Sequence, residues 1–328
     1  MEITIEPAYH GLLLRTYLRN VLGLSSGLLA KMKRSPGAIM LNCCPVTVLA
    51  VLSAGDMLSL STECCDKKAA EECTVLPVEL PLNILYEDQD ILVCNKPAGM
   101  PTHPSHGHYN DTLANAVVFH WQERGSSSMV FRPINRLDRN TSGLVLVAAN
   151  AIAATRLYGA MQRNQIKKTY LAILDGLPAQ ATGRIERPIR RASDTVILRE
   201  VCRDGDVGAQ HSCTCYHTIC HWTSKETGEQ RALVMVAPIT GRTHQLRVHF
   251  SAIGTPILGD ELYGAGPSSE IHRHALHAAC LSFPHPCDGQ IRTFTAPLPP
   301  DMEMVLPDAE KSGSTANVLT NIGLCDFD

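Results

Sequence analysis

The segment 136-RLDRNTSGL-144 carries the strongest local signal in this chain of 328 residues. It sets one carboxylate, Asp138, between Arg136 and Arg139 and follows it with a Thr-Ser-Gly turn. The apolar run LVLVAA starts at the last residue of the segment, so we expect a loop anchored on a buried strand. The two guanidinium groups are expected to keep the carboxylate ionised. Such a held charge suits acid–base or covalent chemistry, and a structural ion pair that braces the strand end is an equal alternative.

The composition is that of a globular protein, with 45% hydrophobic and 19% charged residues. Its length favours two domains over one. No apolar run approaches the ~20 residues of a membrane span, and the N-terminus MEITIEPAYH lacks the pattern of a signal peptide. The 13 cysteines, with adjacent pairs at 43–44 and 64–65, are interpreted as reduced thiols. These features predict a cytoplasmic protein with no membrane partner, and we expect it to be a monomer.

The charge is distributed unevenly, although the net charge is only −3. Residues 7–55 contain arginines and lysines but no Asp or Glu, whereas residues 63–90 are strongly acidic. This asymmetry indicates a basic N-terminal module that could meet a polyanion, and a solvated helix face is the alternative. The residues expected to contact such a polyanion are Arg15, Arg19, Lys31, Lys33 and Arg34.

Hydrophobic periodicity predicts an α+β protein. Residues 1–62 read as two small helices and a few short strands, the second helix capped by Ser25 or Ser26. Residues 63–80 are expected to be an acidic linker. From residue 81 strands outnumber helices and are joined mostly by short turns, so the sheet should be mixed and mostly antiparallel. The tail from residue 301 to 328 is acidic and is expected to be disordered.

Two other candidate sites were weighed on the residues alone. The cluster HSCTCYHTICH at 211–221 would spread its alternating ligands along a strand, which does not suit tetrahedral zinc. Neither GxxxxGK[ST] nor GxGxxG occurs, so no nucleotide cofactor is indicated. We therefore predict no metal and no cofactor. His103, in the long Pro/Gly/His-rich loop NKPAGMPTHPSHGHYND, is interpreted as a substrate contact.

Several motifs together resemble one enzyme family, the RluA-type RNA pseudouridine synthases. They are EDQDILVCNKPAGMPTHP, RLDRNTSG, KKTY, TGRTHQLRVH, LHAACLSFPHP and APLPPD, and they occur in the family's order between residues 81 and 300. The segment LGLSSGLLAKMKRSPGAIMLN and the closing AGDMLSL are similar to an S4-like RNA-binding domain. The resemblance implies a pseudouridine-synthase catalytic domain at 81–300, whose sheet is flanked by helices, and an S4-like domain at 1–62.

The same resemblance implies a role for each matching residue. Asp138 matches the catalytic aspartate, Tyr170 the tyrosine that stacks on the target base and can accept a proton, and Arg247 the arginine that pairs with the aspartate. Arg136 matches an arginine that holds the flipped nucleotide, and Leu246 matches an apolar pocket residue. Where the family has His before RLD, this chain has Asn135, and Arg242 and His244 receive no role.

The function implied is the conversion of uridine to pseudouridine in RNA without a cofactor. Large-subunit ribosomal RNA is the expected substrate, and transfer RNA is the alternative. A third interpretation is a non-catalytic RNA-binding or ribosome-assembly factor, although Asp138, Tyr170 and Arg247 are all present. Whether Asp138 attacks the base or the ribose is left open.

Overall fold

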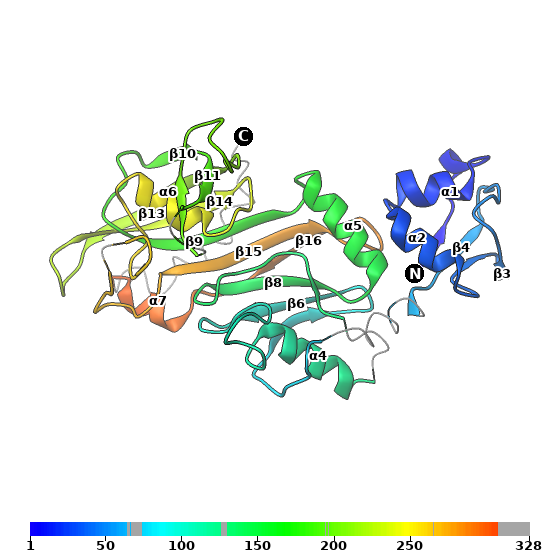
Figure 1. Cartoon of the computed structure of the whole chain (residues 1–328), viewed down its shortest axis with the longest axis horizontal. Coiled ribbons are helices and arrows are strands. Elements are labelled where there is room, and N and C mark those ends of the chain that lie inside the picture. The colour runs from blue at the N-terminus through cyan, green and yellow to red at the C-terminus, as the bar shows by residue number, and fades with distance from the viewer. Residues whose placement is uncertain are drawn as a thin grey trace.

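A computed structural model of the chain describes residues 1–63, 66, 74–125, 130–193, 195, 197–264 and 266–307. Its centre is a ten-stranded mixed sheet with the order β10-β13-β14-β9-β15-β8-β6-β5; β16 pairs with β15 and β7 with β8 (Figure 1). The strands are β5 Asn83–Glu87, β6 Ile91–Lys96, β7 Arg132–Pro133, β8 Ser142–Ala148, β9 Lys167–Asp175, β10 Thr182–Glu186, β13 Cys213–Thr223, β14 Gln230–Pro238, β15 Leu276–Pro284 and β16 Ile291–Thr295.

The pairs in this sheet are antiparallel except for the parallel pair of β15 and β8. The predicted α+β class and the mixed, mostly antiparallel sheet are therefore confirmed. Among its described residues, this part of the chain has four helices: α4 Leu113–Glu123, α5 Ala151–Gln162, α6 Gln245–Ala252 and α7 Pro300–Val305. A separate two-stranded hairpin consists of β11 Ile189–Arg191 and β12 Arg199–Val201.

Alternate side chains of the central strands enter two different cores. On β8, Val145 and Val147 pack in the cluster that contains α4, whereas Leu144 and Leu146 pack in the cluster that contains α5. A strand with a period of two and a helix on each face must be apolar throughout, and all seven residues of β8 are buried. The run LVLVAA therefore does anchor the preceding loop on the most enclosed part of the sheet.

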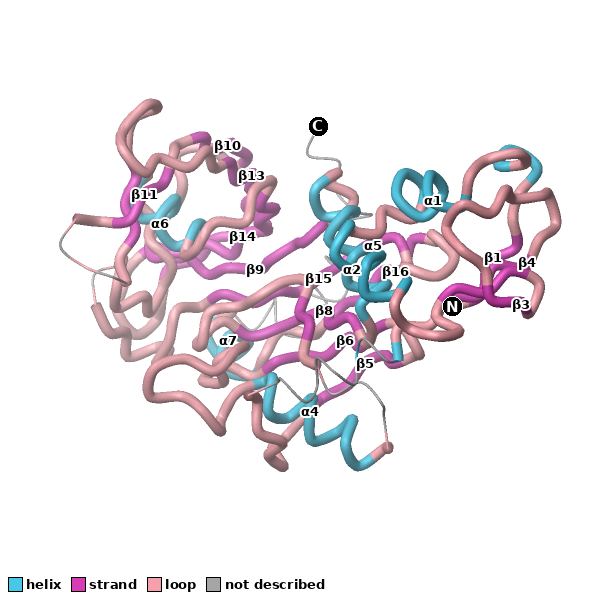
Figure 2. The backbone as a smooth tube through the Cα atoms, turned by 45° about the vertical axis from the view of Figure 1, so that its right-hand side comes forward, coloured by secondary structure: helices cyan, strands magenta, loops and turns pink. Residues whose placement is uncertain are grey.

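The N-terminal residues form a second sheet with the order β1-β4-β2-β3 and their own apolar core. Ser25 caps α2 by accepting a hydrogen bond from the backbone N–H of Leu28. Ile152 of α5 is buried in the same core, so this part packs against the first turn of α5 (Figure 2). The elements are β1 Glu2–Thr4, a 3-10 turn Pro7–Tyr9, α1 Leu14–Thr16, a π-helical turn Tyr17–Val21, α2 Ser26–Lys33, β2 Ile39–Leu41, β3 Cys44–Pro45 and β4 Met57–Leu60.

The structure corrects two expectations about the segments that flank the main sheet. Residues 301–307 are not disordered, because α7 begins at Pro300 and Asp301 pairs with buried Arg273 at 2.6 Å. In the expected acidic linker, Asp66 is buried and pairs with Arg132 at 2.6 Å rather than facing solvent. Residues 64–65, 67–73 and 308–328, on which the remaining linker and tail predictions fall, lie outside the described residues. The predicted domain boundaries remain predictions.

Within the described ranges, no helix is long and apolar enough to cross a membrane.

The pairing of β8 with β15 requires a glycine at position 143, the second residue of β8. Its φ is +115°, and a Cβ there would overlap the backbone carbonyl of Ala278. We expect Gly143→Ala to lower the free energy of unfolding by about 3 kcal/mol, because backbone strain adds to a clash that neither strand can relieve. Gly99→Ala is the matched control, since Gly99 has a φ of +85° with open space around it. Denaturant unfolding measures both, and equal losses would contradict this account of β8.

Candidate active site

The Asp138 loop forms one wall of a cavity of about 710 Å³. The opposite side is made by β9 and by the loop that joins β14 to α6, so segments distant in sequence meet there. Among its lining residues are Arg136, Asp138, Tyr170, Leu246 and Arg247. The cavity thus brings together five of the residues that the sequence predicted to act on substrate.

Asp138 faces a buried arginine across the cavity. Arg247 Nη1 donates to Asp138 Oδ2 at 3.3 Å, and the carboxylate side chain is 29% exposed. Asp260 holds the other side of Arg247 through two hydrogen bonds of 2.7 Å, from Nε and Nη2. Burial alone would raise the pKa of Asp260, but the bonds from Arg247 outweigh it and lower that pKa. Arg247 is therefore a fixed cation that points one N–H at the exposed carboxylate.

His244 approaches the same carboxylate from the start of α6. Its Nε2 lies 3.9 Å from Asp138 Oδ2, and its Nδ1 is 2.8 Å from the hydroxyl of Tyr263. Burial lowers the pKa of His244, with Asp138 opposing the shift. His244 also adopts a left-handed backbone with a φ of +56°. His244 therefore lies close to Asp138, the carboxylate that the sequence singled out.

Tyr170 and Leu246 contribute to the apolar surface of the cavity. Both are largely buried, at 8% and 7% exposed. The Tyr170 hydroxyl has no hydrogen-bond partner among the described residues. Burial, and then the charge of Asp138, raise the pKa of Tyr170, so the phenol keeps its proton at neutral pH. A flat aromatic face beside a carboxylate can receive a planar base.

The arginines that flank Asp138 in sequence do not hold its charge, which corrects the first expectation. Arg136 and Arg139 are both exposed, and Arg139 donates to the carbonyl of Gly99 at 3.1 Å. Within the described ranges, neither makes an ion pair with Asp138. In a tight loop, the side chains of adjacent residues point in different directions. The positive charge beside Asp138 therefore comes from Arg247, 109 residues away in the sequence.

Comparisons with known proteins agree with this geometry. A family model described as RNA pseudouridylate synthase matches residues 90–252. The protein "Uncharacterized RNA pseudouridine synthase YjbO" of Bacillus subtilis is 38% identical over 285 residues, which is 87% of this chain and 95% of that protein. The chain belongs to the RNA pseudouridine synthase family. The predicted RluA-type resemblance and the assignment as an RNA-modifying isomerase are thereby confirmed.

Other relatives of this pseudouridine synthase are described similarly. The ribosomal large subunit pseudouridine synthase D of Vibrio cholerae is 35% identical over 266 residues, and the match covers 77% of each chain. A solved structure of human RNA pseudouridylate synthase domain containing 1 is 31% identical, with a TM-score of 0.55, and covers 66% of this chain and 83% of that one.

The synthase holds its Asp138 loop with a lysine that sequence reasoning did not select. Lys96 is fully buried, and its Nζ donates to the carbonyls of Pro97 at 2.8 Å, Met100 at 2.7 Å and Arg139 at 3.1 Å. Burial lowers the pKa of Lys96 to about 7, and Asp138 opposes the shift. Three carbonyls accept all three ammonium protons, so Lys96 fastens the loop of the NKPAGMP motif to the Asp138 loop.

Two more groups fix the backbone on either side of Asp138. Thr102 Oγ1 donates to the carbonyl of Leu137 at 2.8 Å and accepts from its N–H at 3.2 Å. Arg273 donates to the carbonyl of Asn140 at 3.1 Å. Thr102 lies in the motif MPTHP and Arg273 in HRHALH. Neither motif indicates from sequence alone that its residue binds the backbone next to Asp138.

Two buried histidines complete the support of the turn. His274 Nε2 lies 2.7 Å from Thr141 Oγ1, and His277 Nδ1 lies 2.9 Å from Ser142 Oγ. Burial lowers the pKa of His274 to about 3 and that of His277 to about 4, so both rings are neutral at pH 7. Neutral imidazoles of this kind orient the turn hydroxyls and add no charge to the site.

The remaining predicted residues lie outside this cavity. His103 does not line it and packs edge-on against Phe131 at 5.0 Å between ring centroids. In HSCTCYHTICH, the side chains of Cys213 and Cys215 are buried in β13, and His211 precedes the strand. The described residues contain no group of His, Cys, Asp and Glu that could hold a metal ion. The basic N-terminal residues Arg15, Arg19, Lys31, Lys33 and Arg34 are all exposed.

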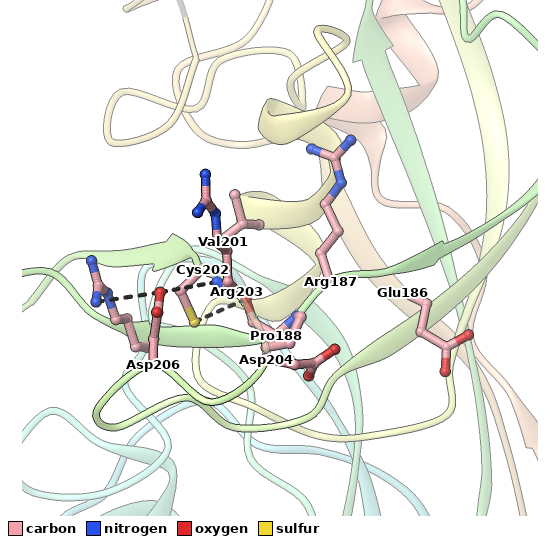
Figure 3. A pocket seen from close by; sticks show the side chains of 9 residues that line it. Glu186, Arg187, Pro188, Val201, Cys202, Arg203, Asp204 and Asp206 are labelled. Carbon is pink, nitrogen blue, oxygen red and sulfur yellow. Dashed lines mark hydrogen bonds and ion pairs between the residues drawn. The ribbon is translucent and has the colours of Figure 1, made fainter.

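A second hollow of about 840 Å³ lies beside the β11–β12 hairpin (Figure 3). Residues that line this hollow contact one another: Arg190 is 3.6 Å from Asp206, and Cys202 Sγ is 3.5 Å from the carbonyl of Pro188. The described lining includes neither Asp138 nor any of its partners. Despite its greater volume, we do not assign the reaction to this hollow.

Proposed function

We propose that this enzyme isomerises particular uridines of RNA through the carboxylate of Asp138, without a cofactor. The observation that carries the proposal is the ion pair between Asp138 and Arg247 in the wall of the cavity. The hydrogen bond from Arg247 fixes the direction of the carboxylate. Because Asp260 grips the same guanidinium at two points, the cation stays in place while the carboxylate reacts.

The reaction balances within the substrate. The bond between N1 of uracil and C1′ of ribose breaks, the base turns, and a bond forms between C5 and C1′. The proton that leaves C5 is matched by the proton that N1 gains, so no atom or electron enters from outside. An ionised carboxylate can serve this sequence as a nucleophile or as a proton acceptor. Both routes need the same exposed anion, which fits the partial exposure of Asp138.

Tyr170 is proposed to support the base rather than to hold a charge. The target uridine must leave its stack, at a cost of a few kcal/mol. Stacking on an aromatic ring returns about 1–3 kcal/mol per base. The raised pKa of Tyr170 makes the neutral phenol the form that meets the base. It can still accept the C5 proton if its own proton moves on in the same step, with Asp138 or water as the receiver.

Arg136 and Leu246 are proposed to hold the flipped nucleotide. Arg136 is exposed at the cavity, where its guanidinium can fill the gap left in the RNA stack. Leu246 contributes an apolar surface next to Arg247. For His103, which packs on Phe131, we propose only a contact with RNA outside the cavity.

Large-subunit ribosomal RNA is the proposed substrate. The supporting observation is that several relatives bear the description ribosomal large subunit pseudouridine synthase D, including those of Zymomonas mobilis at 36% and Vibrio cholerae at 35% identity. The test is to incubate the EDTA-treated enzyme with ribosomal and transfer RNA fractions from cells that lack the gene. Pseudouridine in the ribosomal fraction supports the proposal. Its formation in transfer RNA alone would transfer the proposal to that substrate, and a need for added metal would refute the cofactor-free step.

The N-terminal residues 1–62 are proposed to be an S4-like module that brings RNA to this cavity. Three of its basic residues, Lys31 and Lys33 on α2 and Arg34 directly after it, are exposed and form no ion pair among the described residues. Free cations on one short helix can each release a counterion from RNA.

Replacing Lys31, Lys33 and Arg34 by glutamine should weaken RNA binding and lower the slope of log affinity against log salt by about 2–3. Filter binding at several salt concentrations measures the slope. The same change at Arg163, Lys167 and Arg203, which are exposed on the catalytic part, controls for the loss of three charges. An equal slope in the α2 variant and the wild type would remove this module from RNA binding.

A further inference from the structure

Lys168 is a cation of the cavity that has no role in the proposed reaction. It lies on β9 two residues before Tyr170, so both side chains point to the same face of the strand. Both line the cavity of the Asp138 loop. The wall opposite Lys168 is the backbone at Gly241, where an added Cβ would lie 3.6 Å from the ammonium nitrogen. The half-buried lysine therefore lies between β9 and the loop that leads to α6.

The ammonium group of Lys168 has no partner among the residues that the structure describes. Within the described residues it makes no hydrogen bond and no ion pair. Lys168 is half-buried, whereas the buried cations Arg247 and Lys96 are matched, Arg247 by two carboxylates and Lys96 by three carbonyls. Burial lowers the pKa of Lys168, and no neighbouring charge contributes to the shift. A desolvated cation without a partner is costly unless a ligand brings the opposite charge.

The order of groups along the cavity separates Lys168 from the reacting atoms. Tyr170 feels the charge of Asp138, whereas Lys168 does not. One strand repeat of two residues places Lys168 about 7 Å beyond Tyr170. A base that rests on Tyr170 with its ribose toward Asp138 has its own phosphates at a comparable distance. An anion at that end of the cavity is more consistent with phosphate than with the uracil ring.

We propose that Lys168 binds a phosphate adjoining the flipped uridine and so sets its depth in the cavity. The proposal rests on the function proposed above. Lysine acts on phosphate as a point charge, and an enclosed site strengthens that charge. Lys168 is then a substrate-binding residue that discriminates a nucleotide within an RNA chain from a free nucleoside.

The test uses the full-length enzyme and a short RNA that carries a uridine mapped as its target. Lys168→Gln should raise KM roughly tenfold, change kcat less than about twofold, and lower the salt slope by about 1. Lys168→Arg should restore most of the affinity. Lys167→Gln is the matched control, because Lys167 is the adjacent residue, is exposed, and points to the other face of β9. It should leave KM near the wild-type value.

A second arm identifies the anion. Replacing each phosphate beside the target uridine by an uncharged methylphosphonate should weaken binding to the wild type at one position and have no further effect on Lys168→Gln. Additive losses would overturn the proposal, as would a fall in kcat with KM unchanged, which would place Lys168 on the uracil ring instead. Failure of the proposed function has a different signature: the wild-type enzyme itself would form no pseudouridine.

Discussion

Asp138→Asn is expected to reduce pseudouridine formation roughly 10⁴-fold or more, the scale seen when a reacting group is removed. The amide keeps the shape of the side chain but has neither the charge nor the nucleophilic oxygen. Folding should be nearly unaffected, since Arg247 keeps its two bonds to Asp260. RNA binding should persist, because phosphate contacts do not depend on the carboxylate. Single-turnover assays with RNA from cells lacking the gene measure the rate.

Asp204→Asn is the control for this change. Asp204 is an exposed carboxylate beside the second hollow, away from the cavity of Asp138. It should retain wild-type activity. Activity of Asp138→Asn within tenfold of the control would mean that another group carries the reaction.

Arg247→Met is expected to impair both stability and activity. The Asp260 side chain has no exposed surface, so loss of Arg247 leaves a buried carboxylate unpaired, at a cost of about 3–5 kcal/mol. The activity should fall at least 100-fold, because Asp138 loses the cation that orients it. Chemical denaturation and single-turnover rates measure the two effects on the same protein.

The pH dependence distinguishes this cause from general misfolding. In the wild type the pKa of Asp260 is lowered, so the pair stabilises the fold fully above the ordinary carboxyl pKa near 4 and loses this contribution as the pH falls through the lowered value. In Arg247→Met the carboxyl can be protonated, and the difference in stability should shrink as the pH falls. The double variant Arg247→Met with Asp260→Asn should recover stability but not activity. A difference independent of pH, with no recovery, would contradict the role of Asp260.

Local pattern predicted the elements of this protein well. The apolar strand after the Asp138 loop and the helix cap at Ser25 follow from periodicity and capping, which act between near neighbours. The disorder expected from residue 301 was wrong at its start, because the anchor of Asp301 is Arg273, 28 residues away. Sequence pattern does not reveal such a pairing.

The candidate site shows the same contrast between features that local sequence indicates and contacts between distant residues. The sequence singled out Asp138 from its loop, but the partners of its charge were misread as Arg136 and Arg139. The family resemblance supplied Arg247, which the structure then placed at 3.3 Å. Asp260, Lys96 and Lys168 were missed, since their roles arise only when separate segments fold against one another. Each is recognisable from its partners or, for Lys168, from the lack of one among the described residues.

The most direct measurement is a map of pseudouridines in cellular RNA from three strains: wild type, a gene deletion, and the deletion complemented with Asp138→Asn. Carbodiimide labelling followed by reverse transcription locates each modified uridine. We predict at least one pseudouridine in large-subunit ribosomal RNA that is present in the wild type and absent from both other strains, with equal protein levels of wild type and variant. A site that remains modified in the Asp138→Asn strain and disappears in the deletion would contradict the central role of Asp138.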